Sequence, residues 1–199
     1  MDERFVPKAF ILLLIPYLLF SQTDISKELY DAGFLNLAID HIGDDKSEDA
    51  IFTKAESYFF LSGYKEAYRN YLILSERELK EERLPLIYYR MGDCLWFVGE
   101  KGKAVSIYKN CVLKYPDSPF FSQSLFRIIR YYLEISEYEE AVNTFSSFLE
   151  KYPDFEYKDQ IYLLLARSFE KVGDYKRSLL YHNKITERSK DDELKKGSL

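Results

Sequence analysis

The chain has 199 residues, of which 47% are hydrophobic and 31% are charged, enough apolar mass for a continuous core beneath a solvated surface. The net charge of -5 and the isoelectric point near 5.3 argue against an electrostatic nucleic-acid binder, because phosphate contacts require lysine and arginine concentrated on one face. No linker rich in proline, glycine or serine interrupts the chain, so we predict one domain after the N-terminal segment.

Residues 1–21 are predicted to be a secretory signal peptide. An uncharged apolar run, Ala9–Phe20, follows Arg4 and Lys8. As a helix it would be about 18 Å long, shorter than a hydrocarbon core of about 30 Å, and Pro16 would kink it. We therefore expect cleavage after Ser21 and a mature protein that is exported and does not span the membrane. The alternatives are a retained membrane anchor or an apolar first core helix, whereas lipid attachment through an N-terminal cysteine is excluded because the run ends without one.

Four stretches of the remaining chain recur at an interval of 37 residues. Each contains a small residue followed four positions later by an aromatic residue or histidine, a spacing that places both on one helix face. A fixed period of roughly 20 to 50 residues is typical of stacked supersecondary units, none of which buries its apolar face alone. The recurring pairs are Ala67 and Tyr71, Ala104 and Tyr108, Ala141 and Phe145, and Ser178 and His182.

The unit at residues 85–118 is predicted to be a helical hairpin. Its first helix begins with Pro85 in the first turn and carries an apolar stripe along one face. Gly99 ends this helix, and Pro116 stops a second helix that begins near Lys101. A helix, a tight turn, a second helix and a turn marked by proline therefore make up one unit.

This order of helices and turns, with its recurring residues, resembles the tetratricopeptide repeat family. The resemblance rests on the small and apolar residues of the first helix, the glycine or serine of the turn, the small residue and aromatic of the second helix, and the closing proline. The period exceeds the family's usual length of about 34 residues, and Lys101 stands where a turn tyrosine is usual. The first-helix pairs that carry the resemblance are Ala55 and Tyr58, Gly92 and Leu95, and Ala166 and Phe169.

The resemblance implies an all-α fold, a right-handed superhelical solenoid of antiparallel helix pairs over residues 22–199. The sequence at 114–119 (Lys-Tyr-Pro-Asp-Ser-Pro), together with the signal peptide, further resembles repeat proteins of the bacterial envelope. We therefore expect the mature protein in the periplasm or cell envelope of a bacterium. The implied hairpins lie near residues 24–44, 48–81, 85–118, 122–155 and 159–190, followed by a charged tail at 191–199.

The first and last hairpins depart from the common pattern. In the first, Leu37 and His41 are expected to take the second-helix places after a turn at 32–34. Both His41 and His182 stand where the repeat has a core aromatic, so we expect them to pack and to form hydrogen bonds rather than to bind a metal. Apolar residues on the outer face of the last repeat require covering by the tail, by a second copy or by another protein. These residues are Leu179, Leu180 and Ile185.

In the family that the chain resembles, first helices line a concave groove that binds a peptide or protein partner. Arginines there could hold a carboxylate through bidentate hydrogen bonds, although arginine on a helix face is more often solvated or paired with a neighbouring glutamate. Trp96 is either a binding anchor or a packing residue. The paired Asn and Lys of chaperone-tail binders are missing, so chaperone C-termini are not expected partners. The implied groove residues are Phe52, Glu56, Phe59, Tyr89, Asp93, Trp96, Phe126, Arg127, Arg130 and Arg167, with Leu133, Leu163 and Glu170 beside them and Arg90 close by.

Catalytic and redox signals are weak. The sequence contains no zinc-protease, serine-hydrolase or phosphate-loop motif, so we predict neither enzyme activity nor a metal or other cofactor. Cys94 and Cys111 are interpreted as two core thiols, with a disulfide as the alternative. We predict a non-catalytic, exported scaffold or adaptor that binds a peptide or protein. The alternatives are a membrane-anchored or cytoplasmic regulator and an accessory subunit of an envelope enzyme.

Overall fold

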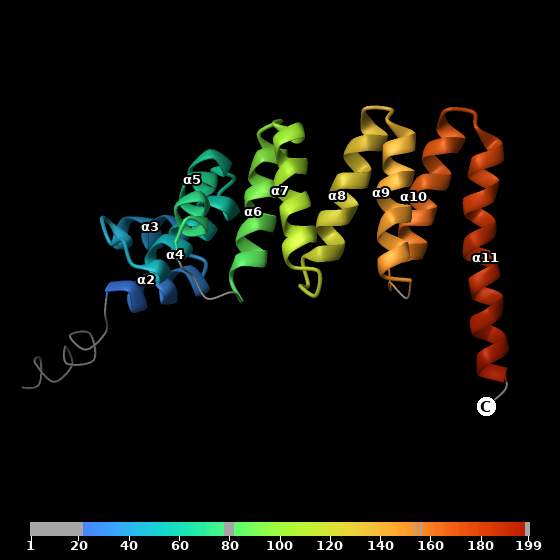
Figure 1. Cartoon of the computed structure of the whole chain (residues 1–199). Helices are drawn as coiled ribbons and strands as arrows, with labels where there is room; N and C mark the ends of the chain where they lie inside the picture. The colour runs from blue at the N-terminus through green and yellow to red at the C-terminus, as the bar shows by residue number, and fades with distance from the viewer. Residues whose placement is uncertain (1–21, 78–81, 154, 156, 198–199) are drawn as a thin grey trace, which may run out of the picture. The chain divides into compact units, whose positions relative to one another are not determined.

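The computed structural model describes residues 22–77, 82–153, 155 and 157–197, and only the backbone of residues 22, 23 and 188–197 (Figure 1). Within these ranges every regular element is an α-helix, which confirms the all-α prediction. The predicted signal peptide lies outside the described residues. The helices are α2 (Gln22–Asp31), α3 (Leu35–Ile42), α4 (Glu48–Phe60), α5 (Tyr64–Ser75), α6 (Leu84–Phe97), α7 (Lys101–Lys114), α8 (Phe121–Glu134), α9 (Tyr138–Lys151), α10 (Lys158–Lys171) and α11 (Tyr175–Gly197).

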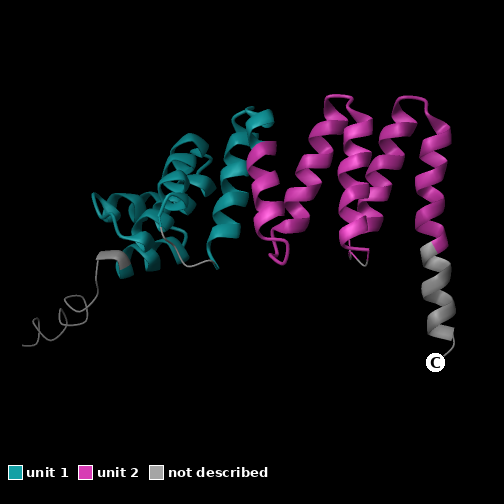
Figure 2. Cartoon of the chain, viewed as in Figure 1, with its two compact units in different colours: residues 1–104 teal, residues 105–199 magenta. Residues whose placement is uncertain are grey.

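The chain divides into two compact units, residues 1–104 and 105–199, with the boundary inside α7 (Figure 2). In unit 1, each helix from α2 to α5 contacts the next one along the chain. In unit 2, α8 packs against α9, α10 packs against α11, and α8 also contacts α10. The helices occupy the expected hairpins, which confirms the solenoid of helix pairs, whereas a single domain over residues 22–199 stays a prediction.

Each first helix ends in the same hydrogen-bonded turn. The residue after the helix C-cap has a positive φ, and the backbone N–H of the following residue donates to the carbonyl oxygen five positions earlier. This is the Schellman arrangement, in which a left-handed residue satisfies carbonyls that the helix end leaves without partners. From Ser62 onward, the interval of 37 residues in the sequence is therefore the spacing between the residues that end successive first helices. The left-handed residues are Gly33 (φ 82°), Ser62 (63°), Gly99 (88°), Ser136 (65°) and Gly173 (81°).

Some of these left-handed positions hold glycine and others hold serine, and this difference leads to a paired stability prediction. Ser136→Gly should raise the free energy of unfolding by about 0.5 to 1 kcal/mol, because glycine removes the Cβ penalty at positive φ. Gly99→Ala should lower it by about 1 kcal/mol; an added Cβ there meets no atom within 4 Å, so the cost comes from the backbone alone. Urea unfolding followed by circular dichroism measures both. Two changes of the same sign would contradict this account of the turns.

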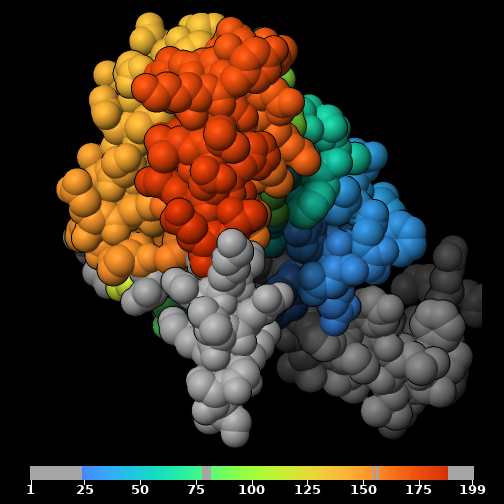
Figure 3. All heavy atoms as spheres, turned by 90° about the vertical axis from the view of Figure 1, so that its right-hand side faces the viewer, coloured from blue at the N-terminus to red at the C-terminus, as the bar shows by residue number. Residues whose placement is uncertain are grey.

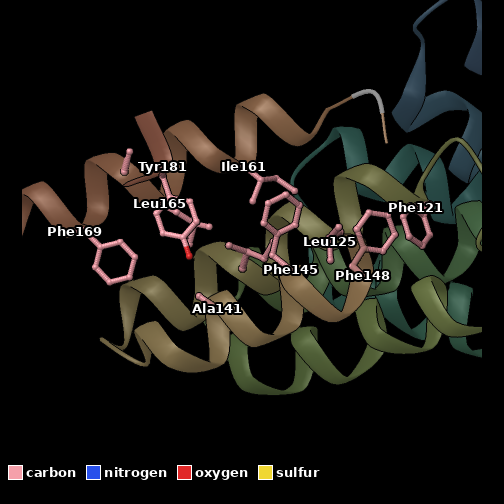
Figure 4. Packing of buried hydrophobic residues seen from close by; sticks show 11 residues of the cluster. Phe121, Leu125, Ala141, Phe145, Phe148, Ile161, Leu165, Phe169 and Tyr181 are labelled. Carbon is pink, nitrogen blue, oxygen red and sulfur yellow. The ribbon is translucent and has the colours of Figure 1, made fainter. Parts of the chain in front are cut away.

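The predicted pairs of small and large residues form the core. Ala67, Ala104 and Ala141 are fully buried, and so are the aromatics that follow four residues later. The last repeat is the exception, because Tyr181 is buried there whereas His182 is only partly buried. The Tyr181 ring stacks on Phe169 with centroids 5.8 Å apart. Figure 4 shows Tyr181 together with residues from α8, α9 and α10 that form the core cluster of unit 2.

The expected register of the first hairpin was wrong by one residue. Leu37 is 55% exposed, and the buried second-helix residues are Ala38 and Ile42. This hairpin is shorter than the others, so the interval of 37 residues does not extend to it, and the small and large pair at i and i+4 determines its register instead. His41 forms the expected hydrogen bond, since its Nδ1 lies 3.2 Å from the buried Ser26 Oγ.

Both cysteines are buried thiols, Cys94 on α6 and Cys111 on α7. Burial and the neighbouring Asp93 charge raise the pKa of the Cys94 thiol to about 12, and burial also raises the pKa of Cys111. Because thiolate is the reactive form, we expect no reaction with a thiol reagent at pH 8 in the native protein. In denaturant without reductant, we expect two thiols to react per chain. A count of zero in denaturant would instead show a disulfide.

Candidate partner-binding groove

The first helices of unit 1, α4 and α6, carry six of the residues predicted to line a groove. Glu56, Asp93 and Trp96 are buried, so their side chains lie within unit 1 rather than on an open face. The burial of Trp96 favours packing over a role as a surface anchor, and the Lys101 ammonium lies 4.9 Å from its ring centroid. The other three, Phe52, Phe59 and Tyr89, are partly buried.

Glu56 is the centre of a buried polar cluster, here called the Glu56 cluster, which also contains Arg90, Tyr71 and Tyr30. The Glu56 side chain is 7% exposed. Arg90 donates from Nε to Oε1 at 3.1 Å and from Nη2 to Oε2 at 3.3 Å. The Tyr71 hydroxyl donates to Oε1, and the Tyr30 hydroxyl donates to Oε2 at 3.5 Å. One carboxylate thus joins α2, α4, α5 and α6.

The electrostatics of this cluster are those of an internal contact. Burial and the Glu56 charge raise the pKa of Tyr30 to about 12, and the same two causes raise the pKa of Tyr71. The Arg90 guanidinium also lies 4.2 Å from the centroid of the Phe59 ring. Four hydrogen bonds use both oxygens of the Glu56 carboxylate. Its charge therefore stabilises unit 1 and is not available to a partner.

The first helices of unit 2 form an open hollow, here called the α8–α10 hollow. It has a volume of about 580 Å³ and lies between the C-terminal part of α8 and α10. Leu133, Leu164 and Val172 contribute apolar surface, and Arg130 and Lys171 contribute cations. A hollow with apolar walls and a few convergent polar groups has the general character of a binding site.

The predicted groove arginines differ in their exposure and in whether they line this hollow. Arg130 lies in its lining and is exposed, and its Nε donates to the Glu134 Oε1 at 2.9 Å. Arg167 is exposed one turn before Lys171 on α10, which places the two cations on one side of that helix. Arg127 on α8 is partly buried, as is Phe126. The structure therefore gathers cations near the hollow, one of them in a surface ion pair.

A second pocket was not expected from the sequence. It has a volume of about 310 Å³, lies among α7, α8 and α9, and is lined mainly by apolar side chains such as Val112, Ile128 and Phe148. Lys109 and Lys151 also belong to its lining. No local spacing in the sequence marks this pocket, because its lining comes from three helices.

The described residues contain no group of three or more histidines, cysteines or carboxylates that could hold a metal ion. None of the helices in the described ranges combines the length and the apolar character needed to cross a bilayer. The absence of catalytic chemistry stays a prediction.

The family model for the tetratricopeptide repeat matches residues 87–118 and 123–154. These ranges coincide closely with the helix pairs α6–α7 and α8–α9. No curated protein matches the chain in sequence.

Several solved structures are similar to this chain over more than four fifths of its length. A crystal structure of MamA is 14% identical, covers 85% of this chain and 90% of its own, and has a TM-score of 0.65. MamA from Desulfovibrio magneticus RS-1 is 12% identical, covers 85% of this chain and 94% of its own, and has a TM-score of 0.62. YrrB, described as a TPR protein with an unusual peptide-binding site, is 14% identical, covers 89% of this chain and 91% of its own, and has a TM-score of 0.62. At these identities the similarity shows the fold.

Proposed function

Because two helix pairs of this chain are tetratricopeptide repeats, we propose that it is a non-catalytic scaffold that binds a peptide or protein partner in the α8–α10 hollow. The observation that carries this proposal is the position of the hollow on two first helices, with apolar walls from Leu133 and Leu164 and cations from Arg130 and Lys171. The similarity to YrrB, a TPR protein with an unusual peptide-binding site, supports a peptide as the ligand.

The partner segment should be acidic and partly apolar. Arg130 and Lys171 line the hollow, and Arg167 is exposed one turn before Lys171 on α10. Guanidinium groups bind carboxylates through paired hydrogen bonds. The Glu134 carboxylate already accepts a hydrogen bond from Arg130. An incoming carboxylate would compete with this exposed ion pair. The free energy lost would be small, because exposed ion pairs contribute about 0.2 to 1 kcal/mol. The aliphatic walls would contact the apolar part of the segment.

A double charge reversal tests the site. Arg130→Glu with Arg167→Glu should abolish the capture of a partner from an envelope extract, with the helical circular dichroism signal unchanged. The matched control is Arg69→Glu with Lys103→Glu, which makes the same change in net charge at exposed positions on second helices. Unchanged capture by the first variant would place binding elsewhere, for example at the pocket among α7, α8 and α9. Equal loss in the control would show a general charge effect.

The proposal also places the mature protein in the periplasm or cell envelope of a bacterium. It is supported by the apolar run Ala9–Phe20 and by its length, which is short for a membrane span. N-terminal sequencing of the protein from cells that express the full chain tests this location. A first residue at or near Gln22 is expected, whereas an intact Met1 would favour an anchored or cytoplasmic regulator.

A further inference from the structure

The outer face of α11 exposes apolar side chains. Among the side chains of this helix that the structure describes, Ser178 and Tyr181 are buried, and Leu179 and Leu180 are 61% and 50% exposed. These leucines line a hollow of about 500 Å³ together with Lys176 and other polar residues of the same helix turns. Figure 3 shows the described part of α11 in red, facing the viewer. Terminal repeats of solenoids usually present a polar outer face, so this face is unusual for a solenoid end.

The described backbone of the charged tail, residues 191–197, continues α11 past this face. The backbone of α11 is one continuous helix from Tyr175 to Gly197, so residues 191–197 extend along the helix axis and away from Leu179. A helix rises about 1.5 Å per residue, which carries residue 191 roughly 18 Å beyond Leu179. A second copy of the chain or another protein can therefore reach this face.

The opposite end of the chain offers a complementary surface. In the α2–α3 hairpin, Phe34 is 57% exposed and Leu37 is 55% exposed. Residues 22–45 contain six carboxylates and one lysine, whereas residues 175–190 contain five lysines and arginines and one glutamate. Exposed apolar residues therefore occur in both segments. Carboxylates predominate in the hairpin, whereas Lys176 and Lys184 are exposed cations of α11 and Arg177 is paired with Asp174 and Glu139. The exposed carboxylates of the hairpin include Asp24, Glu28, Asp31 and Asp40.

We propose that the chain associates head to tail, with the α2–α3 hairpin of one copy on the outer face of α11 of the next. Leu179 and Leu180 would pack against the partner copy's Phe34 and Leu37, while Lys176 and its neighbours face the acidic hairpin. The two surfaces differ, so the contact is heterologous, and an assembly that does not close into a ring keeps one free hairpin and one free α11. Association thus continues beyond a dimer.

This contact has a predictable strength and salt dependence. One helix face against one hairpin is a small interface, and small interfaces of less than about 1,200 Å² are typically weak and transient. We therefore expect association in the micromolar range. Because opposite charges contribute, raising the salt concentration from about 0.05 M to about 0.5 M should weaken it.

Sedimentation velocity on protein recovered from cells that express the full chain tests the proposal. The average mass should rise with protein concentration and fall with added salt. Leu179→Glu with Leu180→Glu, the C-end variant, should stay monomeric, and so should Phe34→Glu with Leu37→Glu, the N-end variant. All four positions are exposed, so circular dichroism should show wild-type helix content in both variants.

A mixture of the two variants gives the decisive result. The C-end variant keeps an intact hairpin and the N-end variant keeps an intact α11, so an equimolar mixture should form 1:1 dimers and nothing larger. Self-association by the N-end variant alone would overturn the proposal in favour of a symmetric α11 contact. A monomeric wild type, or a mixture without dimers, would also overturn it. Partner capture through the α8–α10 hollow should persist in the C-end variant, so this inference and the proposed function fail independently.

Discussion

Glu56→Gln should lower the free energy of unfolding by about 3 kcal/mol. Arg90, Tyr71 and Tyr30 all direct donors at the Glu56 carboxylate, and an amide would place its own NH₂ group among them. The change also leaves the Arg90 charge without its counter-ion at a site where the arginine side chain is only 20% exposed. Urea unfolding followed by circular dichroism measures the loss. Hydrogen exchange should locate it in unit 1, since all four residues belong to that unit.

The matched control is Glu134→Gln, which removes the charge from an exposed pair on one helix. Glu134 accepts from Arg130 four residues earlier, at 2.9 Å. Such pairs contribute about 0.3 to 0.5 kcal/mol, so we expect a change below about 0.5 kcal/mol. Equal effects of the two substitutions would contradict the assignment of Glu56 as a buried junction. A double variant, Glu56→Leu with Arg90→Met, should recover part of the loss, because it removes both buried charges together.

Phe145→Ala should destabilise unit 2 by about 3 to 5 kcal/mol, because it deletes a large buried side chain and leaves a cavity. Phe145 on α9 is fully buried, and its ring meets Tyr162 of α10 edge to face with centroids 5.3 Å apart. Figure 4 shows Phe145 at the middle of the cluster, between Phe148 and Ile161. The substitution therefore removes contacts that join one hairpin to the next. Urea unfolding and hydrogen exchange in α8 to α11 measure the effect.

Leu113→Ala is the control for this prediction. Leu113 is 78% exposed on α7, so its truncation should change the free energy of unfolding by less than about 0.5 kcal/mol. A loss below about 1 kcal/mol for Phe145→Ala would show that the core of unit 2 closes around the missing ring, and would contradict the tight packing described for this cluster.

The helix pairs could be predicted from local sequence, because their determinants lie close together along the chain. Ala141 and Phe145 are four residues apart, and Ser136 stops the preceding helix through its own backbone conformation. The same logic failed where the local pattern was incomplete. In the last repeat, Tyr181 rather than His182 enters the core, because Phe169 and Tyr162 of α10 offer it stacking partners. That choice depends on residues of another helix.

The candidate site was less predictable, because position on a first helix does not determine exposure. Glu56 and Arg130 were both placed in the groove by the family resemblance. In the structure Glu56 is enclosed by donors from three other helices, whereas Arg130 reaches the α8–α10 hollow. The pairing of Glu56 with Arg90 joins residues on helices α4 and α6, and no local spacing rule marks such a pair.

Local sequence accounts for the helical hairpins, their interval and the residues that stop each first helix, because capping, left-handed turns and i to i+4 neighbours act within a few residues. Which polar residues are internal, where the hollow opens and which leucines of α11 stay exposed depend instead on how the helices pack. Burial and hydrogen-bond partnership arise when helices distant in the chain pack together, and their free energy depends on that packing rather than on the local pattern.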